Sequence, residues 1–562
     1  MQQSDATVSD STPAGSCGST SAPGPRSAGL AAMTGDHDLV IVGAGFAGLA
    51  MLNRARGLGL SAIVFERADG VGGTWYWNRY PGARCDIESL EYSYQFDESL
   101  QQQWQWSERY ATQPELLRYA NHVADRFGLR EHLRFETTVL AADYDESAGR
   151  WTVTTDRGDR VGARFLVMAT GCLSSTNLPD FPGRDSFAGP SYHTGQWPRE
   201  PVDFTGKRVG IIGTGSSAIQ SIPIIAEQAL TLTVFQRTAN YAVPAHNGPI
   251  DPGYEARIKA DYAGFRARNS RMMPAYGSSY PRNERSALSV DDDERERIFE
   301  ERWRHGGLPF MGAFNDLMLD PRSNRTAAEF VRRKIREQVR DPALAELLSP
   351  RQTIGCKRLC VDTGYYQTFN RPNVTLVDVG AAPIEAITPT GLRTANASYE
   401  LDCLVYATGF DAMTGTLLKI AITGRGGLRL QDKWHAGPRT YLGLGIAGFP
   451  NLFTISGPGS PSVLTNMLVS IEQHVGWIGD CIDWMRRRGR RRIEATEAAE
   501  DRWVEHVNAV ADATLYPSCN SWYLGANVPG KTRVFMPLIG FPPYVERCAE
   551  VAASGYEGFA FD

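Results

Sequence analysis

The 562-residue sequence has no apolar run that approaches the length of a membrane span. A spanning helix needs roughly 18–20 apolar residues in succession, so we expect no membrane partner. An excess of positive charge is also missing, because 58 Lys and Arg face 63 Asp and Glu. Nucleic acid is therefore not an expected partner. The local run RRRGRRR (486–492) fits a solvated helix end, since Gly489 interrupts it and cations suit helix C-termini.

Cysteine and histidine are sparse, with nine of each. The cysteines form no Cys-x-x-Cys pair and no Cys/His spacing of a zinc site, which argues against a structural metal and against a dithiol redox centre. We therefore expect reduced cysteines, no metal and a cytoplasmic location. Cys356 and Cys360 are the nearest pair in the motif-bearing part of the chain. Their spacing is interpreted as chance, and neither is assigned a role.

Residues 1–36 contain almost no large apolar side chains and are rich in Ser, Gly, Ala, Pro and Thr. Such a segment cannot bury enough surface to offset the entropy of ordering. It also lacks the basic start and apolar core of a signal peptide. The sequence predicts a disordered tail here.

From His37 the pattern changes to an apolar strand, a glycine-rich turn, a helical stretch and a second strand that ends at Glu66. The turn, GAGFAG, has the Gly-x-Gly-x-x-Gly spacing, with glycines at Gly43, Gly45 and Gly48. These glycines allow the turn, the approach of backbone to a pyrophosphate and close helix–strand packing. Glu66 stands where an acidic residue binds the ribose hydroxyls. The alternative is an incidental glycine-rich loop, but the context favours an FAD site.

A second copy of this pattern begins near Lys207. Its turn, GTGSSA, contains Gly213, Gly215, Ser216 and Ser217, with Ala in the third glycine position, which the fingerprint tolerates. No acidic residue follows the second strand; Gln236-Arg237-Thr238 stands there instead. A guanidinium without a competing carboxylate suits a 2′-phosphate, so this unit is expected to bind NADPH through Arg237 and Thr238. A surface arginine at a strand end is the alternative.

The chain is therefore predicted to be an α/β protein with two Rossmann-like dinucleotide-binding domains and a helical insertion. The insertion is rich in helix formers, as in DDDERERIFEERW, and strand-like NVTLVDV (373–379) follows it. We place the FAD-binding domain at 37–165 and 399–562, where the second part also supplies substrate-site loops. The NADP-binding domain occupies 166–245 and 346–398, and the insertion occupies 246–345.

Two further stretches carry a resemblance to a known family. The linker FAGPSYHTGQWP contains Phe187, Gly189, His193, Trp197 and Pro198 at the spacing of FxGxxxHxxxW(P/D). The stretch GTWYWNRYPGARCD is similar to GxWxxxxYPGxxxD, at Gly73, Trp75, Tyr80, Pro81, Gly82 and Asp86. Both resemble the signatures of type I Baeyer–Villiger monooxygenases, in particular the phenylacetone and steroid monooxygenases. The resemblance runs from about His37 to the C-terminus.

The resemblance implies an enzyme that uses FAD, NADPH and O2 to convert a ketone to an ester or lactone through a flavin peroxide. It implies that Arg358 is the active-site arginine, that Asp86 pairs with it, and that Lys357 lies near the NADP 2′-phosphate. The residues Gly73, Trp75 and Trp522 would contact cofactor, with Trp522 on a mobile loop. The linker with His193 would be a hinge between the domains, and Ser462, Val463 and Leu464 would line the substrate pocket.

Two other functions stay open, and the sequence argues against a third. An N-hydroxylating or sulfide-oxidising flavin monooxygenase shares both nucleotide units, and a non-enzymatic NADPH sensor would share the second. A pyridine-nucleotide disulfide reductase would need a redox cysteine pair that the sequence lacks. If the family resemblance is set aside, Arg358 could be a surface phosphate ligand and Asp86 a helix cap. The sequence predicts neither the individual ketone, with a preference only for bulky or aryl-bearing ones, nor the oligomeric state.

Overall fold

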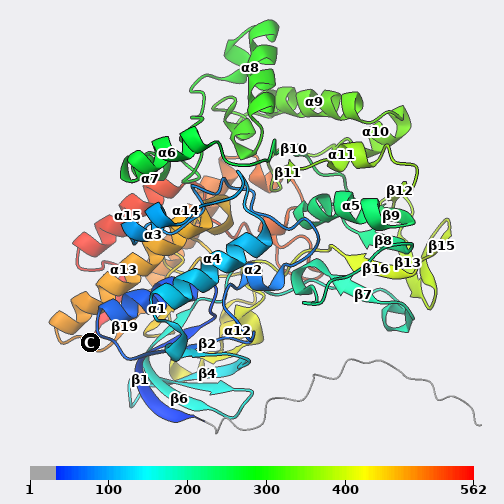
Figure 1. Ribbon diagram of the computed structural model, residues 1–562. Coiled ribbons are helices and arrows are strands. Elements are labelled where there is room, and N and C mark those ends of the chain that lie inside the picture. The colour runs from blue at the N-terminus through cyan, green and yellow to red at the C-terminus, as the bar shows by residue number, and fades with distance from the viewer. Residues whose placement is uncertain (1–32) are drawn as a thin grey trace, which may run out of the picture.

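The computed structural model describes residues 33–562 (Figure 1). Most of the tail expected at 1–36 lies outside the described residues. Its last three residues do not follow the expectation, because the first strand, β1 (Thr34–Val42), already begins at Thr34. The strand is exposed at its start and fully buried from Leu39, as a strand that enters the middle of a parallel sheet should be.

The larger sheet combines strands from both ends of the chain. Besides β1 it contains β2 (Ala62–Phe65), β3 (Leu133–Arg134), β4 (Val139–Asp145), β5 (Arg150–Thr155), β6 (Arg160–Met168), β17 (Ala421–Thr423) and β18 (Leu452–Thr454). Their order is β17-β4-β5-β6-β1-β2-β3, with β18 beside the second half of β6. Because β1 pairs in parallel with β2 and β6, the first predicted βαβ unit is confirmed.

Helices from both ends of the chain cover this sheet. They are α1 (Phe46–Gly57), α2 (Thr74–Trp77), α3 (Glu98–Gln103), α4 (Gln113–Arg126), α12 (Leu430–Lys433), α13 (Met467–Arg487), α14 (Glu497–Asp512) and α15 (Phe541–Ala553). The long α13 packs against α1 and α15, as Figure 1 shows at the left of the molecule. It ends within the RRRGRRR run, where Gly489 has a φ of +67°, so the predicted helix end is confirmed. A small ribbon of β19 (Ile493–Ala495) and β20 (Phe559–Phe561) follows.

The second sheet contains only parallel strands. It is built from β7 (Ser191–His193), β8 (Arg208–Ile212), β9 (Thr231–Gln236), β12 (Val374–Asp378) and β16 (Cys403–Tyr406), and α5 (Ser216–Gln228) crosses over between β8 and β9. The order β12-β9-β8-β16-β7 confirms the second nucleotide-binding unit and the strand predicted at 373–379. A three-stranded antiparallel sheet of β13 (Ile384–Thr388), β14 (Gly391–Thr394) and β15 (Ser398–Glu400) adjoins it.

Helices fill the region between the two halves of this second unit. They are α6 (Pro252–Ala260), α7 (Tyr262–Ser270), α8 (Asp292–His305), α9 (Pro321–Gln338), α10 (Pro342–Leu348) and, after it, α11 (Tyr365–Thr368). Short strands β10 (Ala242–Pro244) and β11 (Cys360–Asp362) pair in parallel where the chain leaves and returns. In Figure 1 this green region stands above both sheets. The exact domain boundaries stay predictions.

One hydrophobic core runs through both nucleotide-binding units, from α1 and α13 to β8, β9 and α5. The two units are therefore packed together along a shared apolar interface, and a site can form between them. None of the helices in residues 33–562 combines the length and apolar character that a membrane crossing requires.

Candidate active site

The first glycine-rich turn is built so tightly that side chains would not fit. A Cβ added to Gly48 would lie 1.8 Å from the carbonyl oxygen of Gly43, and one added to Gly73 would lie 2.9 Å from the Cα of Gly45. Helix α1 begins directly after Gly45, with no side-chain cap and no acidic residue in its first turn. Its free N–H groups and positive dipole end are therefore available to a phosphate.

Glu66 lies just after β2 and is 6% exposed. Its two carboxylate oxygens accept hydrogen bonds from the backbone N–H groups of Ala44 and Ala68, each at 2.8 Å. Burial raises the pKa of Glu66, although these hydrogen bonds work in the opposite direction. The carboxylate is held in place beside the turn, with lone pairs left for hydroxyl donors.

These elements open onto a cavity of about 540 Å³. Its lining includes the predicted residues Gly43, Gly45, Glu66, Gly73, Trp75, Asp86, Ser216, Arg358, Val463 and Trp522. The glycine cradle, the helix N-terminus, the fixed carboxylate and the cavity that they line fit an FAD molecule, with its pyrophosphate at α1 and its ribose at Glu66. The cavity continues to Arg358, so the redox-active end of the cofactor and a substrate would meet there.

Arg358 and Asp86 form a bidentate ion pair in this cavity. The guanidinium donates from Nε to Oδ2 at 2.8 Å and from Nη2 to Oδ1 at 3.0 Å, and Nη1 donates to the carbonyl oxygen of Val463 at 3.1 Å. Burial alone would lower the pKa of Arg358, but the charge of Asp86 outweighs it, and the net pKa is raised well above the usual value. The arginine is permanently charged and held in one orientation.

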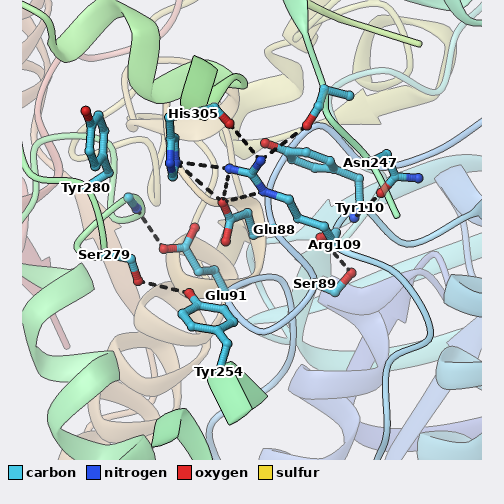
Figure 2. Close-up of polar contacts among 12 residues, drawn as sticks. Glu88, Ser89, Glu91, Arg109, Tyr110, Asn247, Tyr254, Ser279, Tyr280 and His305 are labelled. Carbon is cyan, nitrogen blue, oxygen red and sulfur yellow. Dashed lines mark hydrogen bonds and ion pairs between the residues drawn. The ribbon is translucent and has the colours of Figure 1, made fainter. Parts of the chain in front are cut away.

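A polar network anchors the segment that follows Asp86 (Figure 2). Glu88 accepts from Nε and Nη2 of Arg109 at 3.0 and 2.7 Å, and Nη2 lies 3.0 Å from Nε2 of His305. Nη1 of Arg109 also donates to the carbonyl oxygen of His305 at 2.8 Å. Burial, together with the charge of Arg109, lowers the pKa of His305 to about 4, so this imidazole is neutral at pH 7. The network ties the Asp86 segment to the end of α8.

Glu91, one turn further along, is also part of Figure 2. It is 3% exposed, and Oε1 accepts from the backbone N–H of Gly277 at 2.8 Å. Burial, and then the charge of Glu88, raises the pKa of Glu91 to about 8. The helical insertion is thus fastened to the Asp86 segment by two separate carboxylates.

The second glycine-rich turn repeats the first. A Cβ added to Gly213 would lie 2.4 Å from the carbonyl oxygen of Ala407, whereas the space beside Gly215 is open. Helix α5 starts after Gly215 without a side-chain cap or an acidic residue in its first turn. Ser216 lies 3.4 Å from the sulfur of Cys360, and Ser217 lies 3.1 Å from the hydroxyl of Thr194. The helix N-terminus is again free for a phosphate.

Arg237 and Thr238 follow β9 and are exposed. Lys357 is half-buried, and burial lowers its pKa; the nearby positive charge of Arg237 lowers it further. Two cations that repel each other across an open surface make a favourable place for a multiply charged anion. The pair fits the 2′-phosphate of NADPH.

The linker from Phe187 to Pro198 contributes β7 to the second sheet and contacts the first unit. His193 is 8% exposed; its Nδ1 accepts from the N–H of Gly195 at 3.0 Å, and its Nε2 lies 3.3 Å from the Thr408 hydroxyl. Burial lowers the pKa of His193 to about 4. The N–H of Trp197 donates to the carbonyl oxygen of Trp77 at 3.3 Å. The linker thus connects helix α2, which contains Trp75 and Trp77, to the second nucleotide-binding unit.

The remaining fingerprint residues pack rather than line the cavity. Phe187 closes over Gly189, where a Cβ would lie 2.9 Å from the ring, and Pro198 borders a separate surface hollow. Of the three expected pocket residues, Val463 lines the cavity, whereas Ser462 and Leu464 pack behind it. The rings of Trp522 and Tyr523 are tilted by 51° with centroids 4.3 Å apart, and Trp522 lines the cavity.

Two side chains of the site were not predicted from the sequence. Gln220 of α5 accepts from the hydroxyl of Tyr80 at 2.8 Å and donates to the carbonyl oxygen of Arg84 at 3.1 Å, so it joins the two units beside the cavity. Ser456 also lines the cavity and is 4% exposed, yet its hydroxyl has no hydrogen-bond partner in the protein. A buried hydroxyl of this kind suits a bound polar molecule. A serine in a glycine-rich loop gives no sequence signal.

The expectation of fully reduced cysteines is wrong for one pair. Cys356 is joined by a disulfide to Cys519, 163 residues further along. The other cysteines of residues 33–562, Cys360 among them, are free and buried. Sequence spacing could not indicate the pair, because tertiary structure alone brings these two segments together.

Comparisons with known proteins agree with this geometry. Residues 36–254 match the flavin-binding monooxygenase-like family. A solved structure of oxidised steroid monooxygenase bound to NADP is 55% identical, with a TM-score of 0.89 over 94% of this chain and 99% of that one. A Baeyer–Villiger monooxygenase from Pseudooceanicola batsensis is 44% identical over 94% of this chain and 96% of its own length.

A phenazine N-monooxygenase from Lysobacter antibioticus is 42% identical over 93% of this chain and 96% of its own length. A solved structure of OTEMO in complex with FAD and NADP is 42% identical, with a TM-score of 0.90 over 94% of this chain and 99% of that one. The chain belongs to the flavin-binding monooxygenase-like family and, within it, to the FAD-containing, NADPH-dependent Baeyer–Villiger monooxygenases.

Proposed function

We propose that the protein inserts one oxygen atom of O2 beside the carbonyl group of a ketone at the cavity end marked by Arg358. The observation that carries this proposal is the bidentate pair of Arg358 with Asp86, part-buried in the cavity that the FAD cradle and residues of the NADP unit line together. When bound, FAD supplies the reduction and oxygen activation that side chains lack. Side chains of the protein must bind and orient the reactants and stabilise the charge that develops.

The main requirement is to stabilise negative charge. Attack on a ketone carbonyl turns the carbonyl oxygen into an oxyanion, and a fixed guanidinium in a cavity of low polarity stabilises that charge. Asp86 and the carbonyl of Val463 occupy three of its N–H donors, so the fork is oriented before substrate binds. Asp86 is thus a positioning residue for Arg358, and the Glu88–Arg109 pair in turn positions the Asp86 segment.

Coenzyme choice is the second part of the proposal. We infer that Arg237, Thr238 and Lys357 bind the 2′-phosphate of NADPH while the N-terminus of α5 takes its pyrophosphate. The neutral, buried His193 would couple coenzyme binding to movement of the linker without itself exchanging a proton. Trp522 would close the cavity over coenzyme and substrate.

The substrate proposed is a bulky or aryl-bearing ketone. The apolar side chains of Val463 and Trp522 in the cavity wall suit the ring system of such a ketone. The similar phenazine N-monooxygenase favours one second candidate, oxygen transfer to an aromatic nitrogen. We propose no nucleic-acid partner.

Incubation with NADPH, O2 and a panel of cyclic, aryl and polycyclic ketones, followed by gas chromatography, tests this function. We expect ester or lactone in proportion to NADPH consumed. Phenazine added to the same panel separates the two candidates, since N-oxide without any ester would favour the second. NADPH consumption without an oxygenated product from any compound would contradict both.

We further propose a cytoplasmic location. The six free cysteines within residues 33–562 are what a reducing compartment allows. Fractionation of the source cells and detection of the protein with an antibody would test it.

A further inference from the structure

The Cys356–Cys519 disulfide joins two segments that face one cavity. Cys356 stands two positions before Arg358, and Cys519 stands three positions before Trp522. Both Arg358 and Trp522 line the 540 Å³ cavity. The covalent bond therefore connects the segment with the active-site cation to the segment that covers the site.

Between the two segments themselves, the hydroxyls of Thr353 and Ser518 lie 3.2 Å apart. The Trp522 segment, residues 513–540, is held elsewhere by the N–H of Leu515, which donates to the carbonyl oxygen of Met318 at 2.9 Å, and by an ion pair of Lys531 with Asp411. Residues 513–540 connect α14 to α15 without a long helix or strand of their own. A connection of this length is held mainly by what its ends and contacts fix. A covalent bond near its start limits how far Trp522 can move from Arg358.

The setting of the bond suits reversible cleavage. Cys356 is fully buried, whereas Cys519 is half-buried and lies next to exposed residues. Cys519 is therefore the more accessible end of the bond and the one at which we expect a dithiol to attack. A disulfide in a chain whose other described cysteines are free thiols is of the kind that serves redox sensing rather than bulk stability.

We propose that the Cys356–Cys519 disulfide is a reducible tether that holds the Trp522 segment over the Arg358 side of the cavity, and that its cleavage by a dithiol loosens this segment and weakens coenzyme binding. The last part rests on the proposed role of Trp522 and Lys357 in binding NADPH. Release of the segment does not depend on that role.

The chemistry balances as ordinary thiol–disulfide exchange. A thiolate of the dithiol attacks Sγ of Cys519, the S–S bond breaks, and Cys356 leaves as a thiolate that takes up a proton. Lys357, the next residue, favours this leaving group. The second thiol of the reagent then displaces Cys519. The protein gains two electrons and two protons, and the reagent becomes its cyclic disulfide.

The test uses the FAD-loaded full chain, purified without reductant and divided in two. One half is treated with dithiothreitol and desalted without oxygen. In denaturant, the treated half should show two more reactive thiols. The dissociation constant for NADP+, followed by flavin absorbance, should rise about threefold if the closed fraction falls to about one third. Trypsin cleavage after the exposed Arg533 should also become faster.

Two variants provide controls. Cys519→Ser should behave like the reduced protein with or without dithiothreitol. Ser518→Ala, which removes the neighbouring hydroxyl contact but leaves the disulfide, should keep the full response. An unchanged thiol count, or a changed count with equal NADP+ affinity and equal trypsin cleavage, overturns the proposal. If NADP+ binds neither half, the proposed function fails, and the trypsin rates still decide whether the tether releases the segment.

Discussion

Replacing Arg358 by alanine should separate the two halves of the catalytic cycle. The side chain makes three hydrogen bonds, of 2.8, 3.0 and 3.1 Å, and is the cation of the cavity wall that pairs with Asp86. None of these bonds involves the FAD cradle at Gly45 and Glu66, so Arg358→Ala should still bind FAD and still be bleached by NADPH. Oxygen transfer should fail, because the developing oxyanion loses its fixed positive partner.

The size of the effect follows from the charge that is removed. Loss of one preorganised oxyanion donor costs about 2.7–4 kcal/mol, or about 10²–10³ in rate. Arg358→Lys should fall between alanine and the unmutated protein, since an ammonium keeps the charge but cannot make the bidentate contact with Asp86. Stopped-flow absorbance measures bleaching, and gas chromatography measures ester formation.

A matched control is available in Arg109, another part-buried arginine in an ion pair, which lies outside the cavity lining. Arg109→Ala should reduce stability but lower ester formation less than about tenfold, as expected for a residue that acts only through positioning. Ester formation by Arg358→Ala at the unmutated rate would refute the assignment. An equal loss in Arg109→Ala would show that the effect is structural rather than electrostatic.

Three further predictions concern the cofactors and pH. Glu66→Ala should reduce the affinity for FAD by about tenfold or more, as loss of a charged hydrogen-bond partner costs about 1.5–3 kcal/mol; flavin absorbance per protein measures this, and full occupancy at equal FAD would contradict it. Arg237→Ala should shrink the preference for NADPH over NADH by a similar factor, seen in kcat/KM for the two coenzymes, with Lys357→Ala as the parallel variant; equal use of both coenzymes by the unmutated protein would remove the basis for the assignment. Burial lowers the pKa of His193 to about 4 from a usual value near 6.5, so the folded protein favours the neutral imidazole. The contribution of this preference to the free energy of unfolding is complete above about pH 6.5. It is lost as pH falls toward 4, by up to about 3 kcal/mol. Urea unfolding at pH 7 and pH 5 should show the loss, and His193→Asn should show less of it.

Features whose residues lie close together in the sequence were predicted correctly. The two glycine turns depend on contacts within a few residues, such as Gly48 against Gly43, and both were found where expected. The same holds for the strand at 373–379, whose apolar residues lie within one element. The ion pair of Arg358 with Asp86 joins residues far apart in the chain, and only the resemblance to a family indicated it.

Contacts set by tertiary structure alone were not predictable. Gln220 lies on a buried helix face, where an amide gives no pattern, and its partner Tyr80 comes from another unit. The bond between Cys356 and Cys519 spans 163 residues, and nothing in the spacing of either cysteine indicates it. The first strand also begins earlier than composition suggested, because Thr34 of β1 already pairs with Arg160 of β6, before the apolar residues begin.

The placement of β18 beside β6 has a consequence for how the protein is made. β6 ends at Met168, but the strand that pairs with Leu166, Val167 and Met168 is not reached until Leu452. At roughly 5–20 residues per second, an apolar strand edge stays uncovered on the ribosome for roughly 15–60 seconds. Such edges invite pairing with other chains. During this long interval of synthesis, chaperones, or FAD itself, can compete with aggregation. Slow translation of the middle of the gene would therefore lower the yield of folded protein.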